Sequence, residues 1–237
     1  MTNLAKRSSS PRREQQAVLL DLDGTLVASH NGIIGAMHRA LHDLGHDMDP
    51  ARDLTWVIGP PLHDIMARLL GEFGDDRVGQ AVERYKHHYE GGGLFDSPLF
   101  PGIQLAVEQL AASGRRLFLA TSKPVHTARR ILDARGLSPL FEGMYGARPD
   151  DSGAEKPELI AGLLQREAIA PEHAVMVGDR RFDIAGAHAN RMRAIGALWG
   201  YGGRAELEEA GADALVDAPD GLVEAVHTQL AASAAHG

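Results

Sequence analysis

"AVLLDLDGTLVASH", residues 17–30, is the stretch that decides the fold. Its four leading apolar residues predict a buried strand, and that strand runs into two aspartates, Asp21 and Asp23, one residue apart. Four later apolar runs are also predicted to be strands, at 116–121, 174–179, 192–198 and 213–217. Because apolar strands that alternate with helices suit a sheet covered on both faces, the sequence predicts a three-layer, Rossmann-like α/β core around a parallel sheet.

Residues 31–99 interrupt this pattern. They show no strong strand signal, but apolar residues recur at helical spacing from Ile33 to Leu44 and from Leu62 to Leu70. We therefore expect an inserted all-helical cap domain over 31–99, with a core formed by 15–30 and 100–237. Residues 1–14 are basic and rich in serine, and we expect them to form a disordered tail.

Composition excludes several classes of function. The 237-residue chain has a formal net charge of -8 and no cysteine. The negative charge provides no basic field for a nucleic acid or an anionic membrane, so neither is expected as a partner. No apolar run approaches the ~18 residues of a membrane span, and we expect a cytoplasmic protein. The lack of cysteine excludes disulfides, thiolate metal sites and cysteine nucleophiles.

Polar side chains follow three of the predicted strands. Asp21 and Asp23 follow the first, Thr121 and Ser122 follow the second, and Asp179 follows "AVMVG". Because parallel strands gather their C-terminal ends at one edge of the sheet, where ligands bind, we expect these side chains to meet. Each also has an ordinary explanation when taken alone, since Asp often ends a strand in a turn and Thr is a good strand residue.

The order and spacing of these residues are more specific than any one of them. Four segments together resemble the four motifs of the haloacid dehalogenase-like (HAD) hydrolase superfamily: "DLDGT" at 21–25, Thr121, "EKPEL" at 155–159 and "GDRRFD" at 178–183. Three more are similar to its phosphoglycolate phosphatase branch, which has a helical cap: "TSKP" at 121–124, "FPG" at 100–102 and "VIGPPL" at 57–62. The chain departs from that branch at Ala28, where an Asp is common, and at Ser122, where an Asn is frequent.

The resemblance implies a role for each motif residue. Asp21 is the implied nucleophile and a metal ligand, whereas Asp23 is the implied general acid and base and gives its backbone carbonyl to the metal. Asp179 completes the implied ligands. Asp183 is implied to orient water bound to the metal without binding the metal itself. Thr121 and Lys156 are implied to bind the phosphoryl group that is transferred. The candidate substrate or phosphate contacts are Gly24, Thr25, Ser122, Ser29, His30, Gly59 and Pro60.

The residues themselves point to a cation. Two carboxylates as close as Asp21 and Asp23 repel each other, and a divalent cation relieves that repulsion. Oxygen ligands without cysteine fit Mg²⁺, which prefers few carboxylates together with a substrate phosphate.

The predicted function is Mg²⁺-dependent hydrolysis of a small phosphomonoester through an aspartyl phosphate. Phosphoglycolate, a sugar phosphate and a nucleoside 5′-phosphate stay open as substrates, and the partner is therefore a small phosphorylated metabolite. A phosphomutase of the same superfamily and a non-catalytic binding or regulatory relative are the alternatives. A dehalogenase is disfavoured, because halide displacement does not use the acid that Asp23 supplies. The oligomeric state stays open between monomer and homodimer.

Overall fold

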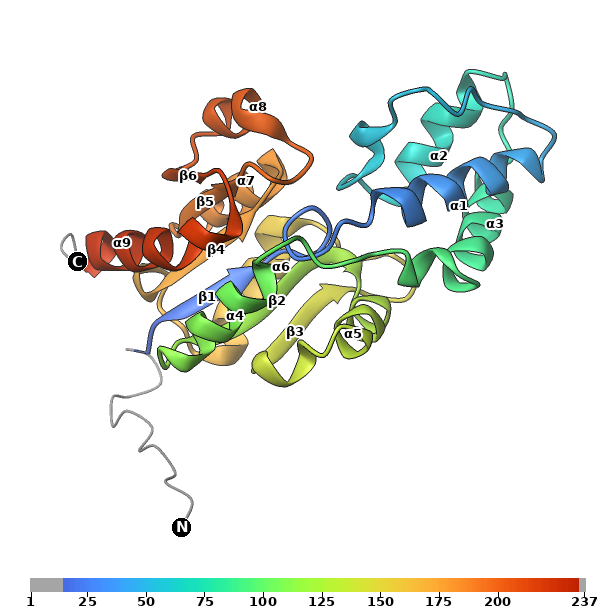
Figure 1. Cartoon of the computed structure of the whole chain (residues 1–237). Helices are drawn as coiled ribbons and strands as arrows, with labels where there is room; N and C mark the ends of the chain where they lie inside the picture. Colours follow the sequence, from blue (N-terminus) through green and yellow to red (C-terminus); the bar gives the residue numbers. More distant parts are fainter. Residues whose placement is uncertain (1–14, 235–237) are drawn as a thin grey trace, which may run out of the picture.

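Six parallel strands form one sheet in the computed structural model, which describes residues 15–234 (Figure 1). Their order across the sheet is β3-β2-β1-β4-β5-β6. The strands are β1 (Ala17–Leu20), β2 (Arg116–Pro124), β3 (Gly143–Ala147), β4 (Ala174–Gly178), β5 (Arg193–Ala197) and β6 (Ala214–Val216). The predicted Rossmann-like α/β class is therefore confirmed. The predicted tail at 1–14 lies outside the described residues.

Helices cover both faces of the sheet. In β1, Ala17 and Leu19 join one buried cluster, whereas Val18 and Leu20 join the other, as expected from the alternation of side chains along a strand. The first cluster packs under α6 (Lys156–Glu167), α7 (Arg181–Ala189) and α8 (Gly203–Glu209). The second packs under α4 (Ile103–Ala112), α5 (Val125–Ala134) and α9 (Leu222–Ala234). These are the three layers that continuous apolar strands predict.

The sheet has one strand that apolar patterning did not predict. β3 has the sequence "GMYGA", whose two glycines and mixed side chains give neither alternation nor a β-branched run. It lies at the edge of the sheet and pairs with β2. Tyr145 ties this strand to α6, since its hydroxyl donates to Glu167 Oε1 at 2.6 Å.

A helical lobe stands beyond the C-terminal ends of the strands (Figure 1). It contains α1 (His30–His42), α2 (Leu62–Gly71) and α3 (Val78–Glu90), together with the 3-10 turns η2 (Thr55–Val57) and η3 (Gly93–Phe95). The chain enters and leaves the lobe side by side, because Val27 forms an isolated bridge with Leu99 and the amide of Ala28 donates to Pro98 O at 2.8 Å. The division into a cap over 31–99 and a core stays a prediction.

Three further 3-10 turns lie in connections of the core: η4 (Ser138–Leu140), η5 (Pro171–His173) and η6 (Pro219–Gly221). Within the described part of the chain, no helix is long and apolar enough to pass through a bilayer.

Candidate active site

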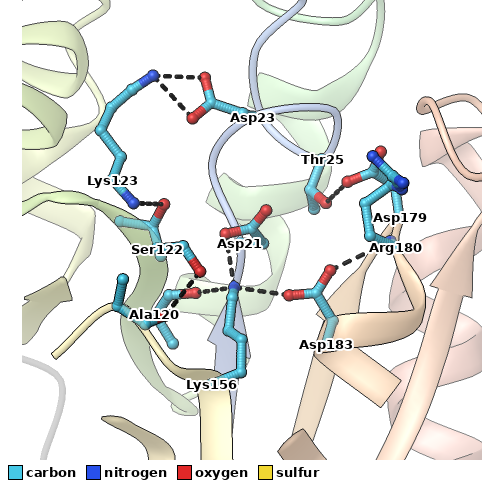
Figure 2. A network of polar contacts seen from close by, with 12 residues as sticks. Asp21, Asp23, Thr25, Ala120, Ser122, Lys123, Lys156, Asp179, Arg180 and Asp183 are labelled. Carbon is cyan, nitrogen blue, oxygen red and sulfur yellow. Dashed lines mark hydrogen bonds and ion pairs between the residues drawn. The ribbon is translucent and has the colours of Figure 1, made fainter. Parts of the chain in front are cut away.

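The predicted site residues gather where the strand order reverses. In the sheet, β1 lies between β2 and β4, and the strand order reverses at this point. The crevice at the C-terminal ends of these strands is therefore the expected ligand site. Asp21 follows β1, and its amide donates to Val177 O of β4 at 3.0 Å. Asp179 follows β4, and Thr121 lies in the neighbouring β2. Figure 2 shows Asp21, Ser122 and Asp179, which lie in or directly after these three strands, at this edge of the sheet.

Lys156 is at the centre of the polar network in Figure 2. Its Nζ donates to Asp21 Oδ1 and to Ala120 O, both at 2.7 Å, and lies 2.6 Å from Asp183 Oδ1. Lys156 begins α6, and Pro157 in the first turn suits a helix start, since proline leaves no amide there without a partner. The side chain is buried, which on its own would lower the pKa of the lysine. Asp183 and Asp21 outweigh that effect and raise the pKa, so the ammonium stays charged.

Three buried carboxylates surround this lysine with more negative charge than it neutralises. Ligand oxygens of Asp21, Asp179 and Asp183 lie within 4.8 Å of one another. Burial raises the pKa of Asp21 to about 7, Lys156 opposes the rise, and Asp183 adds to it. Burial also raises the pKa of Asp179, helped by Asp183 and Asp21. One ammonium therefore does not balance the cluster, and the carboxylates keep part of their protons.

This donor set fits a hard divalent cation. Oxygen atoms from two or three carboxylates, with room left for a substrate phosphate, are what Mg²⁺ accepts in proteins. A second positive charge would also relieve the repulsion that raises the pKa values of Asp21 and Asp179. The cluster could therefore hold such a metal.

Neighbouring backbone and side-chain atoms hold the Asp179 carboxylate in place. Gly24 has φ of 85°, a left-handed conformation that favours glycine, and a Cβ at this position would collide with the Asp179 carboxylate. Thr25 Oγ1 lies 3.2 Å from Asp179 Oδ1, and the amide of Tyr201 donates to Oδ2 at 2.7 Å. Gly24 and Thr25 of the "DLDGT" motif thus position the Asp179 side chain. The loop after β5 takes part as well, which the sequence analysis missed.

Asp23 has a different partner from Asp21. Lys123 Nζ lies 2.9 Å from Asp23 Oδ1 and 2.8 Å from Oδ2, and it donates to Tyr89 Oη of α3 at 3.0 Å. Burial alone would lower the pKa of Lys123, but Asp23 outweighs that effect and raises it. Neither Lys123 nor Tyr89 was predicted as a site residue. The signal for Lys123 was its position in "TSKP", directly after Thr121 and Ser122.

Thr121 and Ser122 both border the same cavity, but their hydroxyls differ. Thr121 Oγ1 accepts the amide of Lys123 at 3.2 Å, which leaves its own proton to donate. Ser122 Oγ donates to Ala154 O at 2.8 Å and so ties β2 to the segment before α6. Thr121 is therefore better placed than Ser122 to donate to a phosphoryl oxygen.

A cavity of about 620 Å³ lies between the sheet edge and the helical lobe. Asp21, Asp23, Thr121 and Lys156 line its floor, and Gly59 and Pro60 line its wall. The structure does not bring Ser29 and His30 to this wall. Ser29 is fully buried, and the amide of His30 donates to Tyr201 Oη at 3.0 Å at the start of α1. Their proximity to the motif in sequence suggested substrate contact, but the chain turns away before it enters α1.

Arg180 joins the core to the wall of the cavity. It caps α7, where its amide donates to Asp183 Oδ2 at 3.1 Å. Its side chain donates from Nη1 to Ile58 O in the "VIGPPL" segment and from Nε to Glu206 Oε1 of α8 at 2.9 Å. This buried arginine was not predicted as a functional residue, although it adjoins Asp179 in the motif.

Comparisons with known proteins bear on the family and the fold of this chain. The sequence profile of the haloacid dehalogenase-like hydrolase family matches residues 18–197. The 5′-nucleotidase of Pseudomonas aeruginosa is 37% identical over 190 residues, which are 80% of this chain and 86% of that protein. Tyrosine-protein kinase PtkA of Mycobacterium tuberculosis is 37% identical over 198 residues, 83% of this chain and 67% of that protein. A hydrolase of the haloacid dehalogenase-like family from Streptococcus pneumoniae superposes with a TM-score of 0.83 at 31% identity, covering 90% of this chain and 98% of that one.

Proposed function

Because this chain belongs to the haloacid dehalogenase-like hydrolases and is by class a phosphoric monoester hydrolase, we propose that it hydrolyses a small phosphate ester with Mg²⁺, through a phosphoryl group carried on Asp21. The observation that carries the proposal is the convergence of Asp21, Lys156 and Asp183 at the floor of the cavity, with Asp23 on the same floor. A nucleophile, a charge partner and a proton carrier are then within reach of one phosphorus atom.

In the first step, a carboxylate oxygen of Asp21 attacks phosphorus and the bond from phosphorus to the alcohol oxygen breaks. Asp23 enters this step protonated, in hydrogen-bond contact with Lys123 and not as its ion-pair partner, and gives its proton to that oxygen, so the product leaves as a neutral alcohol. Lys156 lies against Asp21 and is charged, and Thr121 has a proton to donate. Both stabilise the negative charge on the phosphoryl oxygens in the transition state.

In the second step, water attacks the phosphorus of the aspartyl phosphate. Asp23, now a carboxylate, takes the proton of the water, and the bond from phosphorus to Asp21 breaks. Inorganic phosphate leaves and both aspartates return to their starting states. Asp23 is the acid in the first step and the base in the second, so both rates depend on how its carboxyl group is placed in the cavity.

Mg²⁺ would be held by Asp21, Asp179 and the backbone carbonyl of Asp23, and when bound it supplies charge neutralisation at the phosphate. Asp183 holds Lys156 from the far side, at 2.6 Å, and keeps its ammonium directed at Asp21. Asp183 would therefore have two roles: it positions the Lys156 ammonium, and it supports the metal site.

The proposal is tested by measuring inorganic phosphate released from a panel of phosphate esters, with Mg²⁺ and with chelator, for the wild type and Asp21→Asn. We expect release that needs both the metal and Asp21. Isomerised product without free phosphate would instead identify a phosphomutase. Metal-independent release that survives Asp21→Asn would show that the chemistry lies elsewhere.

One relative is named a tyrosine-protein kinase, so the test also includes an assay for protein phosphorylation. Phosphoryl transfer from ATP to protein tyrosine would use an acceptor hydroxyl in place of water. Incubation with labelled ATP and Mg²⁺ separates the two outcomes, because a hydrolase gives free phosphate and a kinase gives labelled protein. We expect free phosphate from monoesters and no labelled tyrosine.

A further inference from the structure

We propose that the cavity selects esters whose alcohol is uncharged, large and partly aromatic, of which a nucleoside 5′-monophosphate is the representative class, and that it disfavours small or doubly anionic esters such as phosphoglycolate. This inference rests on the proposed function and narrows its substrate. Three properties of the cavity carry it: its size, its apolar wall and its charges.

The size of the cavity exceeds what a two-carbon acid needs. At about 620 Å³ it lies in the range of about 300–1,000 Å³ that holds drug-sized ligands. Phosphate on the floor would occupy the end next to Asp21 and Thr121. The remaining space extends under the helical lobe and would stay filled with water if the alcohol were as small as glycolate.

The wall opposite the floor is mainly apolar. Ile33 and Met37 of α1, Ile58 before α2, and Leu62 and Ile65 of α2 all line it. Apart from Leu62, these side chains are less than 7% exposed, so they form a fixed surface over the cavity. An alcohol that packs against this wall removes its own apolar surface from water, which gains about 25 cal/mol for each Å².

Aromatic rings border the same space. Tyr85 and Tyr89 of α3 stack with ring centroids 5.5 Å apart and an interplanar angle of 8°, and Phe182 of α7 is half-buried on the side of Gly59. Flat rings favour offset or edge contacts with another ring, which a nucleobase offers and a sugar phosphate does not.

Among the described residues, the lysine and arginine side chains around the cavity are all paired, so none is free to bind a second anionic group on the substrate. Each lysine and arginine that lines it, within the described part of the chain, already pairs with a carboxylate, and the histidine of the lining, His126, contacts Thr127 Oγ1 at 3.2 Å. The pairs are Lys86 with Asp151 at 2.7 Å, Lys123 with Asp23 at 2.8 Å, Lys156 with Asp21 at 2.7 Å and Arg180 with Glu206 at 2.9 Å.

Carboxylates also outnumber cations in this lining. Six residues carry an acid, Asp21, Asp23, Glu90, Asp151, Glu155 and Asp183, against four lysine and arginine residues and one histidine. One divalent cation at the floor would offset part of this excess, and the phosphate would then add its own negative charge. A carboxylate or a second phosphate on the alcohol would have to enter without a partner, which is costly in a partly desolvated site.

The inference is tested by kcat/KM with Mg²⁺ for four esters: a nucleoside 5′-monophosphate, glucose 6-phosphate, fructose 1,6-bisphosphate and phosphoglycolate. We expect the nucleoside ester to exceed phosphoglycolate by at least about tenfold, which corresponds to burying a small part of its ring surface. The free nucleoside should also inhibit competitively, whereas glycolate should not.

A charge placed on the wall provides a matched comparison. Leu62→Lys puts a cation inside the cavity, and His63→Lys puts one on the exposed neighbouring residue of the same helix, outside the lining. We expect Leu62→Lys to lower kcat/KM for the nucleoside ester and raise it for phosphoglycolate, with His63→Lys changing neither ratio.

Two results would overturn the inference while leaving the proposed function intact: phosphoglycolate or the bisphosphate hydrolysed as well as the nucleoside ester, or equal effects of the two lysine variants. No phosphate from any ester would overturn the proposed function itself. The two failures are therefore distinguishable in one set of assays.

Discussion

Asp21 and Asp23 are one residue apart, yet each is held by a different lysine from a different element. Lys156 of α6 contacts Asp21, and Lys123 of β2 contacts Asp23. Two like charges at the end of a buried strand are thereby separated into two environments. This separation allows one carboxylate to act on phosphorus while the other moves a proton.

Lys123→Met tests whether this lysine positions Asp23. Without the contact at 2.8 Å, Asp23 is expected to lose its fixed orientation, and kcat should fall by about tenfold to a hundredfold, less than the 10²–10⁴-fold of losing the general acid itself. The loss should be smaller for an aryl phosphate, whose leaving group needs little protonation. Steady-state kinetics on an alkyl and an aryl ester measure the difference.

Tyr89→Phe is the matched control for that variant. It removes only the hydroxyl that accepts from Lys123 at 3.0 Å and leaves the pair with Asp23 in place. A loss of kcat in Lys123→Met that is equal for both esters would contradict a positioning role toward the acid.

Lys156→Met should remove most of the activity. The charged group next to Asp21 is then missing from the transition state, and removal of one such donor costs about 10²–10³ in kcat. The variant is compared with the wild type by kcat and by circular dichroism, so that a folded but inactive protein is recognised. Folded protein with unchanged kcat would exclude this lysine from the chemistry.

Sequence reasoning reached the motif residues because their chemistry and order are specific. Asp21, Thr121, Lys156 and Asp179 come from four separate elements, and the structure brings them to one edge. The pair of Tyr89 with Lys123 was missed for a physical reason. It depends on how α3 packs over the sheet, and no spacing within one segment records that contact.

At the scale of elements, Arg180 is the main tie between the core and the "VIGPPL" segment. Arg180 is the N-cap residue of α7, and its side chain contacts Ile58 O and pairs with Glu206 of α8. One residue thus connects α7, α8 and the segment before α2. The segment at 57–60 lines the cavity, and its position therefore depends on this arginine. Such a contact between a loop and a packed core limits local opening.

Arg180→Met should release the 57–60 segment. We expect faster amide hydrogen exchange there and a KM several-fold higher, since a lost hydrogen bond from a charged group costs about 1.5–3 kcal/mol. Glu206→Gln is the control, because it weakens the pair with Nε and keeps the contact with Ile58 O. Unchanged exchange at 57–60 in Arg180→Met would show that the segment is held by its apolar contacts alone.

Secondary structure was predicted well where periodicity was strong and poorly where it was not. The helical spacing at 33–44 and 62–70 corresponds to α1 (His30–His42) and α2 (Leu62–Gly71). β3 was missed because its strand character comes from pairing with β2 at the sheet edge and not from its own side chains. Tertiary pairing overrides weak local propensity at such an edge.

At the scale of the whole molecule, the buried acid cluster links stability to pH and to Mg²⁺. The pKa of Asp21 is about 7 in the folded chain, above its ordinary value of 3.8, so the folded state holds a proton that the unfolded state has lost between these values. Stability of the metal-free protein should therefore fall as pH rises from about 4 to about 7. Asp179 acts in the same direction.

Mg²⁺ should reverse that trend, since binding requires the ionised carboxylates. We expect the rise in Tm caused by Mg²⁺ to be larger at pH 8 than at pH 5 and to be absent in Asp21→Asn. Thermal unfolding at both pH values, with Mg²⁺ and with chelator, measures it. A shift that is equal at the two pH values would place the metal away from this cluster.

The central claim is that Asp21 carries the phosphoryl group. The most direct measurement is acid-quenched peptide mass spectrometry of Asp23→Asn after reaction with an aryl phosphate and Mg²⁺. The first step then proceeds without an acid, whereas hydrolysis of the intermediate lacks its base. The account predicts a phosphoryl group on the peptide that contains Asp21, and none when Asp21→Asn is added. A phosphoryl group on another residue, or phosphate release that continues in Asp21→Asn, would contradict it.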